Sequence, residues 1–300
     1  MNWKWLKRRI GLTDGTVLAL SGGGARGLAH IGVLQEFDRL GLKPDLVTGT
    51  SIGAIVGAMY CLHGSAAKLE EITRKTIESE HFKDFDIDEM LNDDEDDEPD
   101  SIEQFGARLR RAYTLTKMVR KQSMIEPGVM EAVMGDMFGD ATFEDCKIPF
   151  AAVATDLISG EDITLREGSL ATAVQASASI PGVFAPVEYD GMLLVDGYVT
   201  RNVPIPEPDE PEVDASIIVV DVTRDLYFEG PYKRGIDILS RTDWIMQIHL
   251  NRFYLEKADL VIVPDVRSIH WAEFKKMQPL IEAGRYAARV AEEKILRLFA

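Results

Sequence analysis

The chain of 300 residues is 46% hydrophobic and 28% charged, which is typical of a globular protein whose core needs neither a metal ion nor disulfide bonds. Its 50 acidic residues outnumber its 33 basic residues, and the formal net charge of −17 argues against nucleic acid or an anionic bilayer as the main partner. No stretch approaches 18 uninterrupted apolar residues, and residues 1–14 lack the apolar segment of a signal peptide, so we expect a cytoplasmic protein in which Cys61 and Cys146 are reduced and buried.

Residues 1–15 form a basic, aromatic tip at the N-terminus. The segment Trp3–Arg9 combines two tryptophans with four basic residues, a composition that suits contact with a membrane surface. The alternative is a terminus that packs one tryptophan on the body of the protein. The tip is too short to anchor the chain alone, so it predicts at most a peripheral contact with the inner membrane.

Two strand–turn–helix units follow the tip. The apolar run Val17–Leu20 predicts a buried strand that enters a glycine-rich turn, and residues 25–40 have helical spacing that ends at Gly41. A strand at 46–48, a tight turn at 49–53 and a small-residue helix at 54–62 repeat this order. The alternation predicts an α/β fold with three layers, in which helices cover both faces of a mainly parallel central sheet.

The remaining sequence predicts one domain over residues 16–300, with a helical, acidic insertion at about 74–143. Residues 84–100 contain eleven acids and no Lys or Arg, whereas residues 104–125 contain six basic residues and no acid. The acidic run (Asp84–Asp100) lacks the glycine of a calcium-binding loop, so we expect a solvated loop, or else a charged flap over the site. Further strands are predicted at 150–155, 162–166, 192–195, 216–222 and 260–263, and helices at 168–179, 244–257 and 272–298, the last of which begins around residue 279 or just before it. A surface linker is predicted at 204–212.

The first glycine-rich turn, Gly22–Gly27, allows two interpretations. Its letters GGGARG satisfy the GxGxxG pattern of a dinucleotide site between a strand and a helix. That site also needs an acid at the end of the next strand, but here Asp45 precedes the strand. The alternative is anion stabilisation, because consecutive glycine N–H groups at a helix N-terminus point into one concavity. Gly22, Gly23 and Gly24 are therefore candidate donors to a negative oxygen.

The second turn has the GxSxG pattern of a nucleophile elbow. Gly49 and Gly53 flank Ser51, and glycines at these positions let the turn close so sharply that the serine is held out of the fold at a helix N-terminus. A small-residue turn that serves only helix packing is the alternative. The preceding strand, the following helix and the neighbouring glycine-rich turn favour Ser51 as a nucleophile.

A serine nucleophile needs a proton acceptor, and the sequence offers histidines and one well-placed aspartate. Neither His249 nor His270 ends a predicted strand, and each is interpreted as a helix or surface histidine. Asp196 follows an apolar strand and precedes Gly197, where an α/β sheet presents catalytic side chains. In a dry site that touches Ser51 it can accept the proton as the transition state forms. Asp196 can also be a simple strand-to-turn residue.

Taken together, these residues resemble the patatin-like phospholipases, and among them the compact bacterial members. Gly22–Gly27, with Arg26 and Gly27 as support, is similar to the oxyanion motif of that family, residues 49–54 to its nucleophile elbow, and Asp196-Gly197 to its aspartate box. Similarity continues through the segments 154–157, 177–182, 202–204 and 282–284. The resemblance implies hydrolysis of lipid acyl esters by a Ser51–Asp196 dyad, without a metal ion, a cofactor or a histidine.

One departure from the family pattern concerns the aspartate box. Tyr198 stands where the family usually has Gly or Ala after Asp-Gly, and its ring is expected either to narrow the pocket or to shift the Asp196 carboxylate. Together with the charged insertion, Tyr198 also motivates the alternative of a regulatory or adaptor protein with little catalytic activity. A nucleotide-binding protein is the third hypothesis. The sequence does not predict which lipid or which acyl chain length is used.

Overall fold

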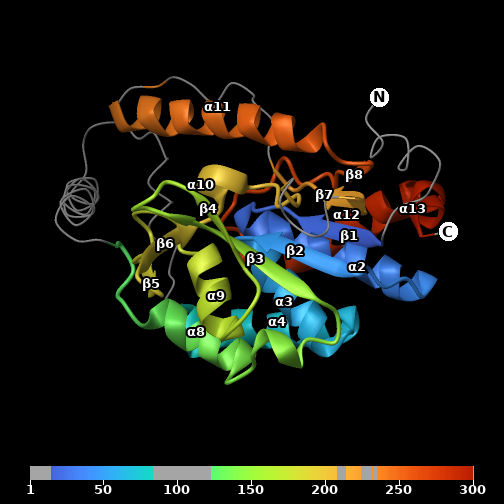
Figure 1. Cartoon of the computed structure of the whole chain (residues 1–300), viewed down its shortest axis with the longest axis horizontal. Helices are drawn as coiled ribbons and strands as arrows, with labels where there is room; N and C mark the ends of the chain where they lie inside the picture. Colours follow the sequence, from blue (N-terminus) through green and yellow to red (C-terminus); the bar gives the residue numbers. More distant parts are fainter. Residues whose placement is uncertain (1–14, 84–122, 208–213, 224–231, 233–234, 300) are drawn as a thin grey trace, which may run out of the picture.

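The computed structural model describes residues 15–83, 123–207, 214–223, 232 and 235–299. The Trp3–Arg9 segment, the acidic run and nearly all of the basic stretch at 104–125 lie outside the described residues, so the hypotheses about them stay predictions. The described chain contains an eight-stranded sheet with helices on both faces (Figure 1). The expected three-layer α/β fold is therefore confirmed.

The sheet has the order β5-β6-β3-β2-β1-β7-β8, and β4 pairs with β3 outside this path. The strands are β1 (Thr16–Leu20), β2 (Leu46–Thr50), β3 (Phe150–Asp156), β4 (Asp162–Leu165), β5 (Val187–Tyr189), β6 (Met192–Asp196), β7 (Ser216–Val220) and β8 (Leu260–Ile262). Strands β3, β2, β1, β7 and β8 are mutually parallel. Strands β4 and β6 pair antiparallel with β3, and β5 pairs antiparallel with β6. The antiparallel pairs therefore lie at the β3 end of the sheet.

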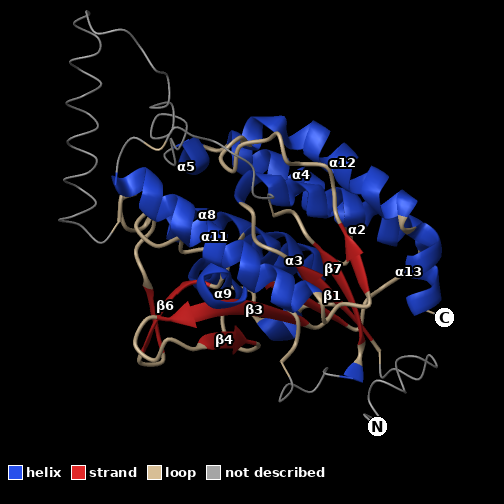
Figure 2. Ribbon diagram, turned by 90° about the horizontal axis from the view of Figure 1, so that it is seen from above, coloured by secondary structure: helices blue, strands red, loops and turns tan. Residues whose placement is uncertain are grey.

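Helices pack on the sheet as two unequal layers. They are α2 (Ala29–Leu40), α3 (Ile52–His63), α4 (Ala66–Glu78), α5 (Glu80–Lys83), α8 (Val129–Phe138), α9 (Leu170–Ser177), α10 (Tyr198–Arg201), α11 (Gly235–Leu255), α12 (Met277–Val290) and α13 (Glu292–Leu298). Figure 1 shows α11 over one face of the sheet and α3, α4, α8 and α9 under the other. Figure 2 shows α2 beside α12. Glycines at the contact let the two backbones approach closely: a Cβ at Gly32 or Gly284 would collide with the opposite helix.

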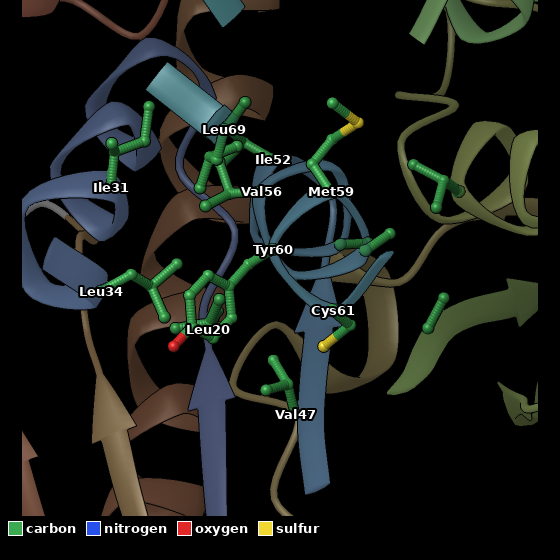
Figure 3. Close-up of a cluster of buried hydrophobic side chains, with 14 of the residues drawn as sticks. Leu20, Ile31, Leu34, Val47, Ile52, Val56, Met59, Tyr60, Cys61 and Leu69 are labelled. Atoms are coloured by element: carbon green, nitrogen blue, oxygen red, sulfur yellow. The ribbon is translucent and has the colours of Figure 1, made fainter. Parts of the chain in front are cut away.

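The alternation of side chains along the central strands divides the core into two parts. Leu18 and Leu20 join the larger cluster with α2 and α3, part of which is drawn in Figure 3. Ala19, between them, joins a smaller cluster that includes Tyr254 of α11. Because both faces of β1 are buried, the strand is a continuous apolar run, as expected for a parallel strand in the middle of a sheet.

Several predicted boundaries were wrong. The helix expected at 25–40 begins with a 3₁₀ turn, η1 (Gly24–Leu28), and the helix expected at 272–298 is divided into α12 and α13 at Ala291. The three-residue strand β5 was not predicted. The segment 204–206 is buried rather than a surface linker, because the Thr48 hydroxyl donates to the Pro204 carbonyl at 2.6 Å.

The two cysteines are free. Cys61 is buried as expected, but Cys146 is only half-buried. Within the described residues, no helix has both the length and the apolar character that crossing a bilayer requires.

Candidate active site

Ser51 and Asp196 meet because β2 and β6 follow one another along the same edge of β3. Thr50, the last residue of β2, pairs with Val153, and Asp196 pairs with the next residue, Ala154. The pairing of β4 overlaps both of these stretches of β3, so β4 occupies the opposite edge. The carboxyl end of β2 therefore meets the carboxyl end of the antiparallel strand β6, and the two candidate residues lie next to each other.

Ser51 has the backbone conformation of a nucleophile elbow. It is the N-cap of α3, with φ 56° and ψ −126°, and it is one of only two non-glycine residues in the described chain with positive φ. The turn is closely packed, because a Cβ at Gly53 would collide with the Leu20 carbonyl, and one at Gly49 would lie 2.5 Å from the Ala54 Cα. The flanking glycines thus permit the tight approach of the turn to β1, and the strain is concentrated at Ser51.

Asp196 is a fully buried carboxyl group beside this serine. Its Oδ1 accepts a hydrogen bond from the backbone N–H of Tyr198 at 2.8 Å, while Oδ2 is buried without a fully formed hydrogen bond to the described residues. Burial raises the pKa of Asp196 to about 7, against the lowering effects of the Ser51 hydroxyl and the Tyr198 N–H. A carboxylate with such a pKa is a far better base at neutral pH than one in water.

The glycine-rich turn reaches the same site from the carboxyl end of β1. The Gly22 N–H donates to the carbonyl of Asn202 at 3.2 Å, and the Ala25 N–H donates to the carbonyl of Trp271 at 2.6 Å. The N–H groups of Gly23 and Gly24 make no hydrogen bond to the rest of the described chain. Gly24 has φ +60°, and a Cβ on it would collide with the Trp271 carbonyl.

The remaining motif residues support this arrangement. Arg26 Nε donates back to the Gly23 carbonyl at 3.0 Å, which closes the turn on itself. A Cβ on Gly27 would collide with the Ile52 side chain, and one on Gly197 with the Val153 carbonyl. The glycines therefore bring the oxyanion turn against the nucleophile helix, and the aspartate box against β3.

Two residues that the sequence analysis quoted without a role hold the turns in place. Ser177 accepts the Ser51 N–H through both its carbonyl oxygen at 3.2 Å and its hydroxyl oxygen at 3.1 Å, and the same hydroxyl donates to the Val153 carbonyl at 2.6 Å. Asn202 packs its side-chain oxygen against Gly22 and accepts the Gly22 N–H. Both lie in segments of family resemblance, which was the only sequence signal for them.

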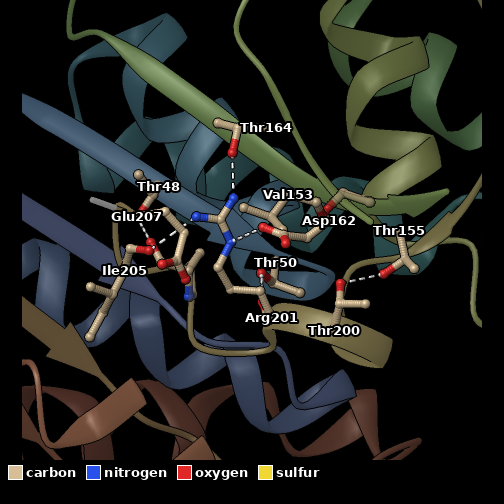
Figure 4. A network of polar contacts seen from close by, with 12 residues as sticks. Thr48, Thr50, Val153, Thr155, Asp162, Thr164, Thr200, Arg201, Ile205 and Glu207 are labelled. Carbon is tan, nitrogen blue, oxygen red and sulfur yellow. Dashed lines mark hydrogen bonds and ion pairs between the residues drawn. The ribbon is translucent and has the colours of Figure 1, made fainter. Parts of the chain in front are cut away.

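A polar network fastens the chain after Asp196 to the nucleophile strand (Figure 4). The Thr50 hydroxyl donates to the Arg201 carbonyl at 2.8 Å. The Arg201 guanidinium is buried, with Nε 2.8 Å from an Asp162 carboxylate oxygen, Nη1 donating to the Ile205 carbonyl at 3.1 Å and Nη2 donating to the Thr164 hydroxyl. This network ties β2, β4 and the segment after Asp196 together.

Ser51 lies at the meeting point of two cavities. The polar cavity, of about 430 Å³, has a mixed wall: Asp196, Asp243, Gln247 and Asn251 lie beside apolar residues such as Trp244, and it takes its name from the charged groups that, among the described residues, the second cavity lacks. A second cavity of about 100 Å³ is lined mostly by apolar side chains, which come from α3, α4, α5, α8 and the segments around Ala178, Phe184 and Phe274. Tyr198 lines the polar cavity, and its backbone N–H donates to the Asp196 carboxylate.

Two histidines, His30 and His270, lie near the candidate dyad. His270 is exposed in a loop, as expected of a surface histidine, and it also lines the polar cavity; its Nδ1 accepts from the Ala272 N–H at 3.4 Å. His30 is fully buried under the glycine-rich turn, with Nε2 2.9 Å from the Ser21 carbonyl. Burial lowers the pKa of His30 to about 4, so the ring is neutral and braces the turn. The described residues contain no cluster of three or more His, Cys, Asp and Glu suited to a metal ion.

The dinucleotide interpretation of Gly22–Gly27 finds no acid where a ribose would need one. Asp45 lies at the amino end of β2, where its carboxylate accepts the Thr16 N–H at 2.7 Å. The glycine-rich turn follows β1 at the opposite end of the parallel pair. The carboxyl end of β2 instead presents Ser51.

Comparisons with known proteins identify the family of the chain. The profile of patatin-like phospholipases matches residues 18–209. The chain is 31% identical over 311 residues to an "Uncharacterized NTE family protein" of Mycobacterium tuberculosis, covering 95% of this chain and 48% of that protein. It is also 31% identical over 265 residues to "Patatin-like phospholipase domain-containing protein 6" of Mus musculus, covering 86% of this chain and 17% of the relative.

The chain spans about half the length, or less, of these curated relatives. Among solved structures, the crystal structure of VipD from Legionella pneumophila is similar, with a TM-score of 0.50 and 15% identity, over 94% of this chain and 67% of VipD. This likeness concerns the fold. The extent of the profile match, over nearly two thirds of the sequence, shows that the chain belongs to the patatin-like phospholipase family.

Proposed function

We propose that the protein is a serine hydrolase of lipid acyl esters that works through a Ser51–Asp196 dyad. The single observation that carries the proposal is the fully buried Asp196 carboxylate beside a strained Ser51 at a helix N-terminus. A buried base with a pKa near 7 can take a hydroxyl proton at neutral pH. Family membership supports a lipid ester as the substrate.

In the acylation step, the Ser51 hydroxyl oxygen attacks the ester carbonyl carbon and its proton passes to Asp196 Oδ2. The carbonyl oxygen gains the negative charge. We assign its stabilisation to the N–H groups of Gly23 and Gly24, while the Gly22 N–H, which donates to Asn202, positions the turn. Each such donor contributes roughly a hundredfold to a thousandfold in rate. The intermediate then expels the alcohol, which receives the proton from Asp196.

In the deacylation step, water attacks the acyl-Ser51 carbonyl and gives its proton to Asp196. Collapse of the second intermediate releases the fatty acid and returns the proton to Ser51. Desolvation of Asp196 serves both steps, because the same carboxyl group must accept a proton and then give it up.

The test is labelling by a fluorophosphonate probe, followed by intact mass and location of the adduct. Wild-type protein should carry one adduct on Ser51, and Ser51→Ala should carry none. Ser179→Ala is the matched control, because the Ser179 hydroxyl donates to the Gln175 carbonyl of α9 and its loss should leave labelling intact. Absence of an adduct on folded wild-type protein would contradict the hydrolase and favour the adaptor role.

A second test compares Asp196 with His270 as the catalytic base, because His270 lines the same cavity as Ser51. If Asp196 is the base, Asp196→Asn should lose turnover of a short p-nitrophenyl ester, whereas His270→Ala should retain most of it. The reverse result would make the histidine the base and overturn the dyad.

A further inference from the structure

The apolar cavity beside Ser51 is separate in character from the polar one. The two cavities share Gly24, Ser51, Ile180 and Trp271, so the nucleophile lies at their junction. Beyond the junction, the walls of the apolar cavity contain no charged side chain among the described residues. Polar and ionic headgroups would lose their hydration there without gaining partners, which is unfavourable.

Helix α8 supplies one wall of the apolar cavity. Met130, Val133, Met134 and Met137 have the spacing of one helix face and all line it. These side chains are buried, with Met134 2% and Met137 9% exposed. Methionine is unbranched and flexible, so it adapts to chains of varied shape.

Two aromatic rings from distant parts of the sequence also line the apolar cavity. Phe82 of α5 and Phe274 of the 3₁₀ turn Phe274–Lys276 lie edge to face with ring centroids 5.2 Å apart. Both line the apolar cavity. The lining is therefore apolar from α8 to these rings, which favours an occupant that is apolar along its length.

We infer that the apolar cavity binds the acyl chain of the ester, that the polar cavity receives the leaving alcohol, and that Met134 and Met137 set the accepted chain length. The inference rests on the proposed function. An ester carbonyl at Ser51 has its acyl chain on one side and its alcohol on the other, and the junction offers one apolar and one polar direction for them.

The experiment measures kcat/KM on p-nitrophenyl esters from acetyl to palmitoyl. Each methylene that enters the apolar cavity should raise kcat/KM about fourfold, and the rise should stop once the cavity is full. The chain length at which the rise stops is the break in the profile. Met134→Ala removes three heavy atoms from the cavity wall, so it should move the break to acyl chains that are longer by about three methylenes. Met137→Phe should move the break to shorter chains, and it removes no packing from the core.

Met59→Ala is the matched control. Met59 is fully buried in the main cluster and is not part of either cavity, so its truncation should lower stability while leaving the break in place. A break that both Met134→Ala and Met137→Phe leave unmoved would overturn the inference. So would a break that moves in Trp244→Ala, because Trp244 lines the polar cavity.

Fluorophosphonate labelling on the same preparations separates the two levels of the proposal. A labelled enzyme that cleaves all chain lengths equally would overturn only the acyl site. A folded protein that is neither labelled nor active on any ester would overturn the hydrolase and the acyl site together.

Discussion

The backbone N–H of Ser51 lies between two oxygens of Ser177, the carbonyl at 3.2 Å and the hydroxyl at 3.1 Å. The same carbonyl also accepts the N–H of Gly197 at 3.4 Å, directly after the aspartate. One residue of α9 therefore contacts the backbone on both sides of the dyad. Its position fixes the nucleophile turn relative to the base.

Ser177→Ala removes the hydroxyl that bridges Ser51 and Val153. We expect kcat for a short ester to fall roughly tenfold with little change in KM, because small displacements of a nucleophile reduce the rate more than binding. The comparison variant is Ser179→Ala, which truncates another buried serine two residues away and leaves the contact with Ser51 intact. Equal effects of the two substitutions would assign Ser177 a structural role only.

The pH dependence of the reaction follows from the raised pKa of Asp196. The base must be deprotonated, so kcat/KM should increase with pH through about 7 and level off above it. Steady-state kinetics on a neutral ester between pH 5 and 9 measures this directly. A flat profile down to pH 5 would show that the catalytic base has an ordinary carboxyl pKa.

The ionised Asp196 should also lower the free energy of unfolding at the pH where it acts as a base. Its folded-state pKa of about 7 is above the unfolded value of about 3.9, so the native state binds the proton more tightly and stability falls as pH rises between these values. Asp196→Asn should therefore be more stable than wild type at pH 8, by at most on the order of 4 kcal/mol. Near pH 4 the difference should vanish, and denaturant melts at both pH values test this.

The positive φ of Ser51 predicts that the nucleophile position lowers the stability of the fold. A backbone φ of 56° is strained for a residue that has a Cβ, whereas glycine adopts it without strain. Ser51→Gly should be more stable than Ser51→Ala by about 1 kcal/mol, with both inactive. Thermal unfolding of the two variants is the measurement, and a less stable glycine variant would refute strain at this position.

Arg201 is expected to matter for stability rather than chemistry. Arg201→Met leaves Asp162, Thr164 and the Ile205 carbonyl without their partner, and should lower the free energy of unfolding by about 2–4 kcal/mol. Arg297→Met is the control, since its ion pair with Glu293 is exposed and should contribute close to zero. Urea melts compare the two, and a difference below about 1 kcal/mol would contradict the buried network.

The elements formed by residues that are contiguous in the chain were predictable from the sequence. A strand followed by Gly-Thr-Ser-Ile-Gly and a helix specifies the elbow, because the turn conformation and the helix N-terminus come from contiguous residues. The glycine-rich turn and the apolar strands were predictable for the same reason. Short or irregular elements were not: β5 has three residues, too few for a periodic pattern, and the segment 204–206 is buried by contacts with β1, β2, β7 and α11.

Tertiary structure alone decided how the parts meet. Ser51 and Asp196 are separated by 145 positions, and they become neighbours because β2 and β6 share one edge of β3. Likewise, the pKa of Asp196, the contacts of Ser177, the place of His270 and the apolar cavity between α4, α5 and α8 all depend on segments far apart in the chain. Burial and cavity shape are properties of the packed molecule, which no local pattern of residues encodes.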